Sequence, residues 1–532
     1  MNPTPSGPQA AIIRFSIRFR GIVIALACVL LGYGVYALRQ AKYDVFPEFA
    51  PPQVGIQTEA PGLNPKQVEM LVTGPIETAV NGVPGVRSVR STSLQGLSFI
   101  TVVFDPQSDI YRDRQVVAER LAIAAGQLPR GVQPPALTPL TSSASVVLYA
   151  GLTSPTRSLM ALRTIADWTV RLRLAAVPGV AQVTVFGGEV RSLQIQVHPD
   201  RLVRFGLGFN QVIAAAQRAS GVRGAGFIDT PNQRIVFHSE GQALTPAAIA
   251  QAVLASAGGV SVTLGNVAEI VEAPEPAIGV STIAGRPAVI LKVSEQFGAN
   301  TLELTKRVET ALAELRPGLE KAGVRLHPDL FRPATFIETA TGNMQTSLVL
   351  GGLLVIAVLF LFLFDLAMAA ISVVAIPLSL LAAVIVLQYF GTTLNTMTLG
   401  GLAIAIGVVV DDAVIDIENV VRRLRENRNR AEPRAAAPVV LDACLEVRGA
   451  VVYATFAVIL VVLPVLALSG VAGRLFAPLG IAYSAAVLAS LLVALSVTPA
   501  LLMAFLARRG SKDAEPPVVR WTKRGYVALL RR

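Results

Sequence analysis

The chain alternates long apolar stretches with one long mixed segment. Crossing the hydrocarbon core of a bilayer takes about 20 apolar residues, and six stretches reach that length. One lies near the N-terminus, and the other five follow a polar segment with ordinary globular patterning, residues 39–346. The pattern predicts membrane-spanning helices at 21–38, 347–364, 366–390, 396–421, 449–469 and 475–507.

The pattern of residues 39–135 predicts one α/β subdomain with elements in the order β-α-β-β-α. Its first helix begins with Asn64 as N-cap and Pro65 in the first turn. A hairpin crosses Gln95-Gly96, and a second helix starts after the capping residue Asp109. The alternation of strands and helices predicts helices packed against one sheet.

A second copy of this unit follows. Val83-Pro84-Gly85-Val86 recurs as Val177-Pro178-Gly179-Val180, in each case after a predicted helix and before a predicted hairpin. The second hairpin is expected to join strands at 180–186 and 189–198. Both units have the pattern of a ferredoxin-like sandwich, so the predicted fold class is an α+β membrane protein with six transmembrane helices. We expect the second subdomain at 136–199 and 281–335, with 200–280 as an insertion.

Basic residues orient the chain across the membrane. Three arginines precede the first span, which places residues 1–20 in the cytoplasm by the positive-inside rule. Six spans then place the loop 422–448 and the tail 508–532 on the same side, and both are basic. Residues 39–346 would lie outside. Much of the net charge of +11 is therefore a topology signal, and no nucleic-acid partner is expected.

The composition fits a chain that is partly solvated by lipid. Charged residues make up 15%, against about 25% in a typical soluble domain. The two cysteines, Cys28 and Cys444, lie in different predicted environments, so neither a disulfide framework nor a two-cysteine metal site is expected. The sequence contains no P-loop motif and no Ser-His-Asp or Cys-His arrangement. We therefore predict a secondary active transporter rather than an enzyme, without a cofactor and driven by proton motive force.

The fourth predicted span contains four acids, Asp411, Asp412, Asp416 and Glu418. Carboxylates at membrane depth cost several kcal/mol when ionised, so they are rarely without a function. At 100° per residue, Asp412 and Asp416 share a face, and Asp411 and Glu418 align two turns apart. We expect an acidic strip that faces the interior of a helix bundle. Because neighbouring carboxylates in a low dielectric cannot all stay ionised, the strip predicts a proton relay.

A static ion pair is the alternative interpretation of these acids. It would need a cation on a neighbouring helix, and the other five predicted spans contain no interior Lys or Arg. The sequence therefore predicts that the cationic partner is not in this chain. Glu418 lies within one turn of Arg422, so an interfacial position is an alternative for that residue.

The chain resembles the N-terminal half of a resistance–nodulation–division (RND) efflux transporter. The resemblance is carried by the order of spans and by V-D-D-A-V-I-D-I-E-N-V at 410–420. Residues 54–63 and 109–121 are similar to the heavy-metal-efflux branch, and residues 200–227 resemble the docking subdomain of the family. The resemblance covers essentially the whole chain.

This resemblance implies a homotrimer in the bacterial inner membrane that exchanges protons for substrate. The two α/β subdomains would be periplasmic porter subdomains. The insertion 200–280 would be a docking subdomain that meets a periplasmic adaptor, or membrane fusion protein, and an outer-membrane channel. By motif position, Asp411 and Asp412 match the family's proton-relay acids. The implied cargo is metal cations or other toxic compounds.

The sequence departs from the metal-exporting branches in its fourth span. The divalent-metal branch commonly has D-F-G where this chain has Ala405-Ile406-Gly407. The copper and silver branch has several methionines in this helix, and only Met397 matches them, while Val409 and Asp416 occupy two other methionine positions. A thioether path for Cu(I) is therefore weakly supported, and Met397 is a candidate metal ligand with core packing as the alternative.

Relatives usually duplicate this half, and the residues after 508 resemble the linker helix before a seventh span. The missing second half would hold the lysine that partners Asp411 and Asp412 and most of the substrate site. Two rival interpretations are an accessory subunit of protein export, which shares the half architecture, and an inactive half-transporter fragment. The docking-like insertion and the acidic motif favour efflux.

Overall fold

A computed structural model describes most of the chain. By contact clustering it divides into two compact units, one comprising Met1–Val147, Glu295–Lys306 and Arg332–Arg532, the other Leu148–Ser294 and Arg307–Phe331. Each unit is described by itself. The described residues are 7–44, 46–221, 227–236, 243–257, 260–277, 279–363 and 366–505, with 524, 526, 527 and 530.

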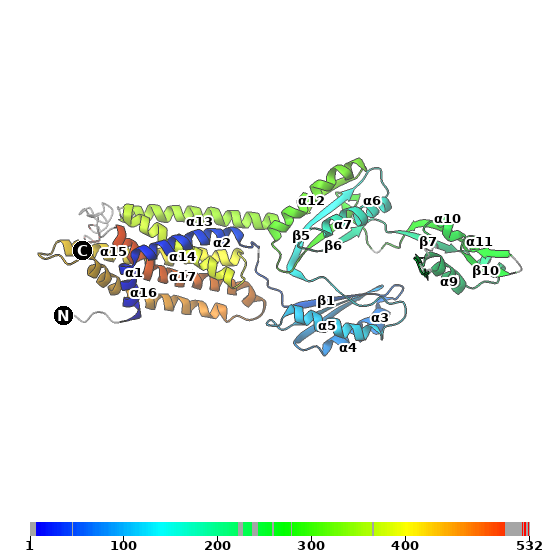
Figure 1. Ribbon diagram of the computed structural model, residues 1–532, viewed down its shortest axis with the longest axis horizontal. Helices are drawn as coiled ribbons and strands as arrows, with labels where there is room; N and C mark the ends of the chain where they lie inside the picture. The colour runs from blue at the N-terminus through cyan, green and yellow to red at the C-terminus, as the bar shows by residue number, and fades with distance from the viewer. Residues whose placement is uncertain are drawn as a thin grey trace. The chain divides into compact units, whose positions relative to one another are not determined.

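Six long helices of the first unit are long and apolar enough to cross a membrane, counted over the described residues by length and composition. They lie side by side in Figure 1, preceded by the short helix α1 (Pro8–Arg18). The six are α2 (Arg20–Gln40), α13 (Ala334–Leu363), α14 (Leu366–Tyr389), α15 (Thr396–Arg428), α16 (Ala436–Leu466) and α17 (Gly470–Phe505).

Helices α15 and α16 extend beyond the predicted spans. The side chain of Asn395 caps α15 by accepting hydrogen bonds from the backbone N–H groups of Met397 and Thr398, both at 3.0 Å. The helix then continues to Arg428, and α16 already begins at Ala436. The segment 422–448, predicted as a loop, is therefore mostly helical. Hydropathy marks only the apolar part of a helix. The end of α15 is rich in arginine, and the beginning of α16 contains Asp442, Glu446 and Arg448.

Helix α17 forms the centre of the bundle. It packs against α1, α2, α14, α15 and α16, and most of its residues are buried. It approaches α15 closely at Gly401, where an added Cβ would lie 2.4 Å from the carbonyl oxygen of Leu479. A glycine at this position lets the two backbones meet, so α15 is held tightly against the central helix.

The first α/β subdomain has the predicted order of elements. Its sheet runs β2-β3-β1-β4, and β1 pairs antiparallel with β3 from Gln53–Val103 to Glu59–Leu97. The capping box of Asn64 and Gln67 starts the first helix, as expected. That helix contains a π turn between two α segments. The elements are β1 (Gln53–Glu59), α3 (Pro65–Val68), η1 (Glu69–Thr73), α4 (Gly74–Asn81), β2 (Val86–Leu94), β3 (Leu97–Phe104), α5 (Ile110–Ala125) and β4 (Ala136–Leu137).

The second α/β region repeats this order, including the π turn. Its sheet runs β16-β5-β15-β6. The repeated turn has a glycine with positive φ in both copies, Gly85 at +79° and Gly179 at +99°. The elements are β5 (Thr141–Thr153), α6 (Leu159–Ile165), η2 (Ala166–Val170), α7 (Arg171–Ala175), β6 (Val180–Gly187), β15 (Val289–Gln296), α12 (Thr301–Lys321) and β16 (Arg325–Phe331).

One predicted hairpin is wrong. Strand β7 (Arg191–Val197) does not pair with β6 but with β12 (Ala268–Pro274) of the insertion, in antiparallel register. Gly187 and Gly188 both have positive φ and turn the chain away from β6. Periodicity predicts a strand but not its partner. The other described elements of this region are α8 (Pro199–Arg204), α9 (Phe209–Ser220), β8 (Phe227–Asp229), β9 (Arg234–Val236), α10 (Pro246–Ala250), β10 (Val253–Ala257), β11 (Val260–Thr263), α11 (Leu264–Val267), β13 (Thr282–Ile283) and β14 (Arg286–Pro287). Most of the predicted linker helix at 508–532 lies outside the described residues.

Candidate functional site

The four acids of the motif in α15, Asp411, Asp412, Asp416 and Glu418, lie on two different faces of the helix. Asp412 is 7% exposed and Asp416 is 0% exposed, so both point into the bundle. Asp411 and Glu418 are exposed on this chain. The four acids therefore do not form one strip. Asp412 and Asp416 lie one turn apart and share a face, whereas Asp411 is rotated by 100° from Asp412 around the helix. Only Asp412 and Asp416 satisfy the expectation of an inward-facing acid.

Asp416 is paired with a cation from the same chain. The Nη2 atom of Arg448, on α16, donates to Oδ2 of Asp416 and also to the backbone oxygen of Ala494, at 2.7 Å. Both side chains of the ion pair are 0% exposed. The prediction that this chain holds no cation for its acids is therefore wrong for Asp416. Arg448 is the residue just before the apolar stretch 449–469, and the longer helix α16 carries it into the bundle.

Asp412 is held from the central helix. The hydroxyl of Ser490 donates to its Oδ2 atom at 3.0 Å. Ser490 and Ala494 lie one turn apart on α17, as Asp412 and Asp416 do on α15, so two turns of α17 face two turns of α15. The guanidinium of Arg448 also interacts electrostatically with Asp412. The result is a buried polar cluster at the junction of three helices.

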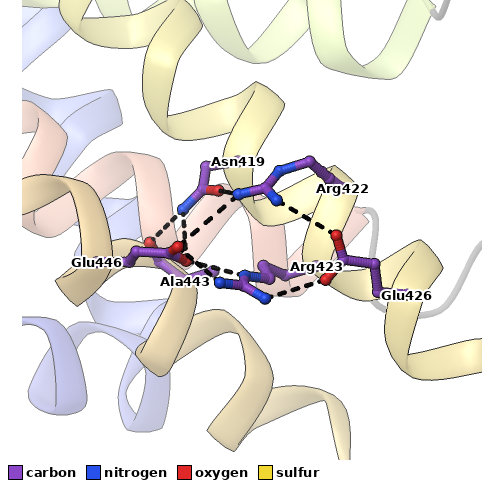
Figure 2. A network of polar contacts seen from close by, with 6 residues as sticks. All are labelled: Asn419, Arg422, Arg423, Glu426, Ala443 and Glu446. Atoms are coloured by element: carbon purple, nitrogen blue, oxygen red, sulfur yellow. Dashed lines mark hydrogen bonds and ion pairs between the residues drawn. The ribbon is translucent and has the colours of Figure 1, made fainter. Parts of the chain in front are cut away.

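A second polar network ties α15 to α16 one turn further along (Figure 2). The side-chain amide of Asn419 donates to the backbone oxygen of Ala443 at 2.8 Å, and Arg422 donates to Asn419 at 2.6 Å. Arg423 forms two hydrogen bonds to Glu446, at 2.8 and 2.6 Å. Glu418 takes no part in these contacts. In this network the neighbouring Asn419 is the motif residue that joins α15 to α16.

Met397 lies in the first turn of α15, at the opposite end of the helix from Asp416, and is partly buried. Across the described residues there is no group of three or more His, Cys, Asp or Glu side chains that could hold a metal ion. A role of Met397 as a ligand stays a prediction.

Outside the bundle helices, the buried acid Glu295 and the half-buried acid Asp44 both interact with Thr301. Thr301 donates to Oδ1 of Asp44 at 3.2 Å, and Glu295 is 3% exposed. Burial raises the pKa of Glu295 from 4.5 to about 7, partly offset by a hydrogen bond with Thr301 and reinforced by the charges of Asp44 and Glu48. Burial also raises the pKa of Asp44. Neither acid was singled out in the sequence, because each stands alone in an otherwise ordinary segment.

Comparison with known proteins decides the family. The sequence model of the AcrB/AcrD/AcrF family matches residues 12–532. The chain belongs to this family. The resemblance to RND transporters that its spans and acidic motif predict is thereby confirmed.

Several curated relatives of this AcrB/AcrD/AcrF-family chain are named for metal resistance or cation efflux. Protein HelA of Legionella pneumophila is 32% identical over 532 residues, covering 98% of this chain and 50% of the relative. The cobalt-zinc-cadmium resistance protein CzcA of Cupriavidus metallidurans is 29% identical, and the cation efflux system protein CusA of Escherichia coli is 31% identical, each with the same coverage. The chain spans about half the length of the curated relatives it matches.

The fold is that of solved family members. Two crystal forms of a heavy metal efflux pump match the chain with TM-scores of 0.80 and 0.79, at 27% and 26% identity. Each match covers 98% of this chain, and 50% and 48% of the pump respectively. The AcrB/AcrD/AcrF-family fold, with its mixed helices and strands and several apolar helices, is therefore present along the whole chain.

Sequence reasoning missed three polar members of the buried site in this family member. Arg448 was excluded by placing the span boundary one residue too late. Ser490 sits in an apolar helix, where a single hydroxyl carries no signal. Asn419 belongs to the acidic motif at 410–420, but helical periodicity alone does not show that its side chain faces α16. The helical spacing from Asp412 to Asn419 could have identified that face.

Proposed function

We propose that this protein exports divalent metal cations across the inner membrane of a bacterium in exchange for protons. The observation that carries the proposal is the buried cluster of Asp412, Asp416 and Arg448 inside a bundle of apolar helices. Buried ionisable groups at membrane depth mark proton paths. Transport is proposed for the chain together with the counterpart of its relatives' remaining half, whether on the same polypeptide or on another.

The choice of cargo follows from the relatives and from ligand chemistry. Relatives carry names that mention cobalt, zinc, cadmium and nickel. Only Met397 supports a thioether path in α15, and soft Cu(I) prefers such ligands. We therefore favour divalent cations as cargo over Cu(I).

We further infer that all six apolar helices span the membrane with the N-terminus in the cytoplasm. Large apolar side chains cover the outer faces of α2 and α13, for example Val29 and Leu350, each 67% exposed, as expected of surfaces that contact lipid. The basic ends of α1 and α15 would face the cytoplasm.

The α/β regions are proposed as ferredoxin-like porter subdomains, 39–135 and 136–199 with 281–335, and the insertion 200–280 as a docking subdomain. The shared order of strands, helices and π turns supports two related subdomains. By analogy with the family, we propose a homotrimer that works with a periplasmic adaptor and an outer-membrane channel.

Replacement of relay acids tests this function. Asp411→Asn and Asp412→Asn keep the size of each side chain but cannot carry a proton, so we expect loss of resistance to Zn²⁺, Co²⁺ and Cd²⁺ in a sensitive strain that expresses the complete pump. Membrane levels of the protein should be unchanged. Glu418→Gln, within one turn of Arg422 at the arginine-rich end of α15, is the matched control and should retain resistance. Full resistance with Asp412→Asn would refute proton coupling through α15.

A further inference from the structure

The ion pair of Asp416 and Arg448 lies on one side of Asp412. Asp416 follows Asp412 by one turn, towards the arginine-rich end of α15 where Asn419 and Arg423 join the helix to α16. In the proposed topology this end faces the cytoplasm. The pair therefore stands between Asp412 and the side to which a transported proton must be released.

The positive charge of Arg448 is not confined to Asp416. Asp412 lies one turn before Asp416 on the same buried face of α15, so the guanidinium that pairs with Asp416 stands one turn from Asp412. Within the described residues, the Nε and Nη1 atoms of Arg448 have no hydrogen-bond partner, and neither has Oδ1 of Asp416. A guanidinium with free donors and a unit charge in a low-dielectric interior acts strongly on a carboxylate one turn away.

Among the described residues of the bundle helices, Asp412, Asp416 and Arg448 are the only charged side chains that are buried. Helix α14 contains no charged residue. Arg14 and Arg18 of α1 and Arg39 of α2 are exposed, and Arg20 is half-buried at the first residue of α2. The buried Cys444 of α16 is neutral in its ordinary form. Other charged side chains of the bundle helices have partners away from the cluster. Three of them form ion pairs: Glu446 with Arg423, Asp442 with Arg434, and Glu338 with Arg332. Arg474 of α17 donates to the backbone oxygens of Ala50 and Pro106.

We propose that Arg448 and Asp416 are positioning residues of the proton relay. The pair fixes a positive charge one turn to the cytoplasmic side of Asp412, and this charge promotes release of the proton from Asp412 towards the cytoplasm. Asp416 holds the guanidinium in place and neutralises part of its charge, so that Asp412 can still take up a proton from outside. This inference deepens the proposed function and rests on it.

A charge-neutral double variant tests the role of the pair. Asp416→Asn with Arg448→Gln removes both members of the ion pair, so neither is left buried without its partner and the bundle should fold. Transport of Zn²⁺, Co²⁺ or Cd²⁺ would be measured with the complete pump in proteoliposomes while the pH on the cytoplasmic side is varied. Without the guanidinium Asp412 holds its proton more tightly. We expect transport to fall about tenfold at pH 7 and to recover when that pH is raised by about one unit.

The single variant Asp416→Asn predicts the opposite shift. It leaves Arg448 charged and without its carboxylate, so the pH profile should move towards acid. These opposite signs separate a positioning role from a structural one. The matched control is Arg423→Gln with Glu446→Gln, which removes an ion pair between the same two helices and should keep the pH profile of the unmodified pump.

Two results would overturn the inference: both pair variants keep the unmodified pH profile, or both lose transport at every pH while remaining folded. Asp412→Asn in the same assay separates this failure from failure of the proposed function. If Asp412→Asn transports normally, proton coupling through α15 is wrong. If it is inactive while the pair variants behave like the unmodified pump, only the role of Arg448 and Asp416 is wrong.

Discussion

At the scale of single residues, the buried charged side chains of the helix bundle, Asp412, Asp416 and Arg448, form one cluster. Asp412 and Asp416 were recognisable from the sequence because an acid inside an apolar helix is conspicuous. Arg448 was not, because it stands at the edge of an apolar stretch, where arginine usually faces the interface. Only the packing of α16 against α15 shows that its guanidinium is inside. Hydropathy can thus show which acids lie within an apolar helix, whereas the residues that pair with them depend on tertiary contacts.

Glu295 makes stability depend on pH. Its pKa is raised from 4.5 in the unfolded chain to about 7 in the folded protein. The folded state therefore keeps a proton that the unfolded state releases, and stability falls as pH rises from 4.5 through 7. Glu295→Gln should remove this loss and stabilise the protein by about 2–3 kcal/mol at pH 8, with little effect at pH 4.5.

Thermal unfolding in detergent between pH 4.5 and 8 measures this effect. The unmodified protein should lose thermal stability across the range relative to Glu295→Gln. A substitution of exposed Glu303 by Gln serves as the control and should follow the unmodified protein. Parallel curves for Glu295→Gln and the unmodified protein would show that folding does not raise the pKa of Glu295.

At the scale of elements, α15 shows what periodicity can and cannot give. Its existence, its start at Thr396 and the shared face of Asp412 and Asp416 all follow from the sequence. Its length does not, because the arginines that end the apolar stretch are themselves good helix formers. The wrong partner predicted for strand β7 has a similar cause, since alternating residues indicate a strand but not which strand it pairs with.

The contact of α15 with α17 depends on Gly401. A methyl group at this position would meet the backbone oxygen of Leu479, which cannot move aside as a flexible side chain can. Gly401→Ala should therefore push the helices apart at a cost of about 1–3 kcal/mol and lower both the unfolding temperature and transport.

Gly407 of the same helix provides the matched control, because nothing lies within 4 Å of a Cβ added there. Gly407→Ala should leave the unfolding temperature unchanged or raise it slightly, since alanine favours helix. Equal behaviour of Gly401→Ala and Gly407→Ala would argue against a tight contact between α15 and α17.

At the scale of the whole molecule, the sequence predicted the family and the repeated α/β unit. The repeat was visible because the V-P-G-V turn needs a glycine with positive φ in both copies. The cargo could not be predicted in the same way. A metal site is made by side chains that meet in space, and the described residues offer no cluster of suitable ligands.

The membrane topology can be tested with engineered cysteines. In a background with Cys28 and Cys444 replaced by alanine, Gln115→Cys on α5 should react with an impermeant maleimide added to intact spheroplasts. Glu432→Cys, between α15 and α16, should react only after the membrane is permeabilised. The reverse pattern would invert the proposed orientation, and labelling of both from outside would contradict six spans.

The most direct test of proton-coupled metal export is proton flux in proteoliposomes that contain the complete pump. A gradient of Zn²⁺, Co²⁺ or Cd²⁺ is imposed, and a pH-sensitive dye reports proton movement in the opposite direction. Proton coupling through α15 predicts metal-dependent proton flux in the unmodified protein and with Glu418→Gln, and loss of this flux with Asp412→Asn. Metal-dependent proton flux of normal size with Asp412→Asn would contradict proton coupling through α15.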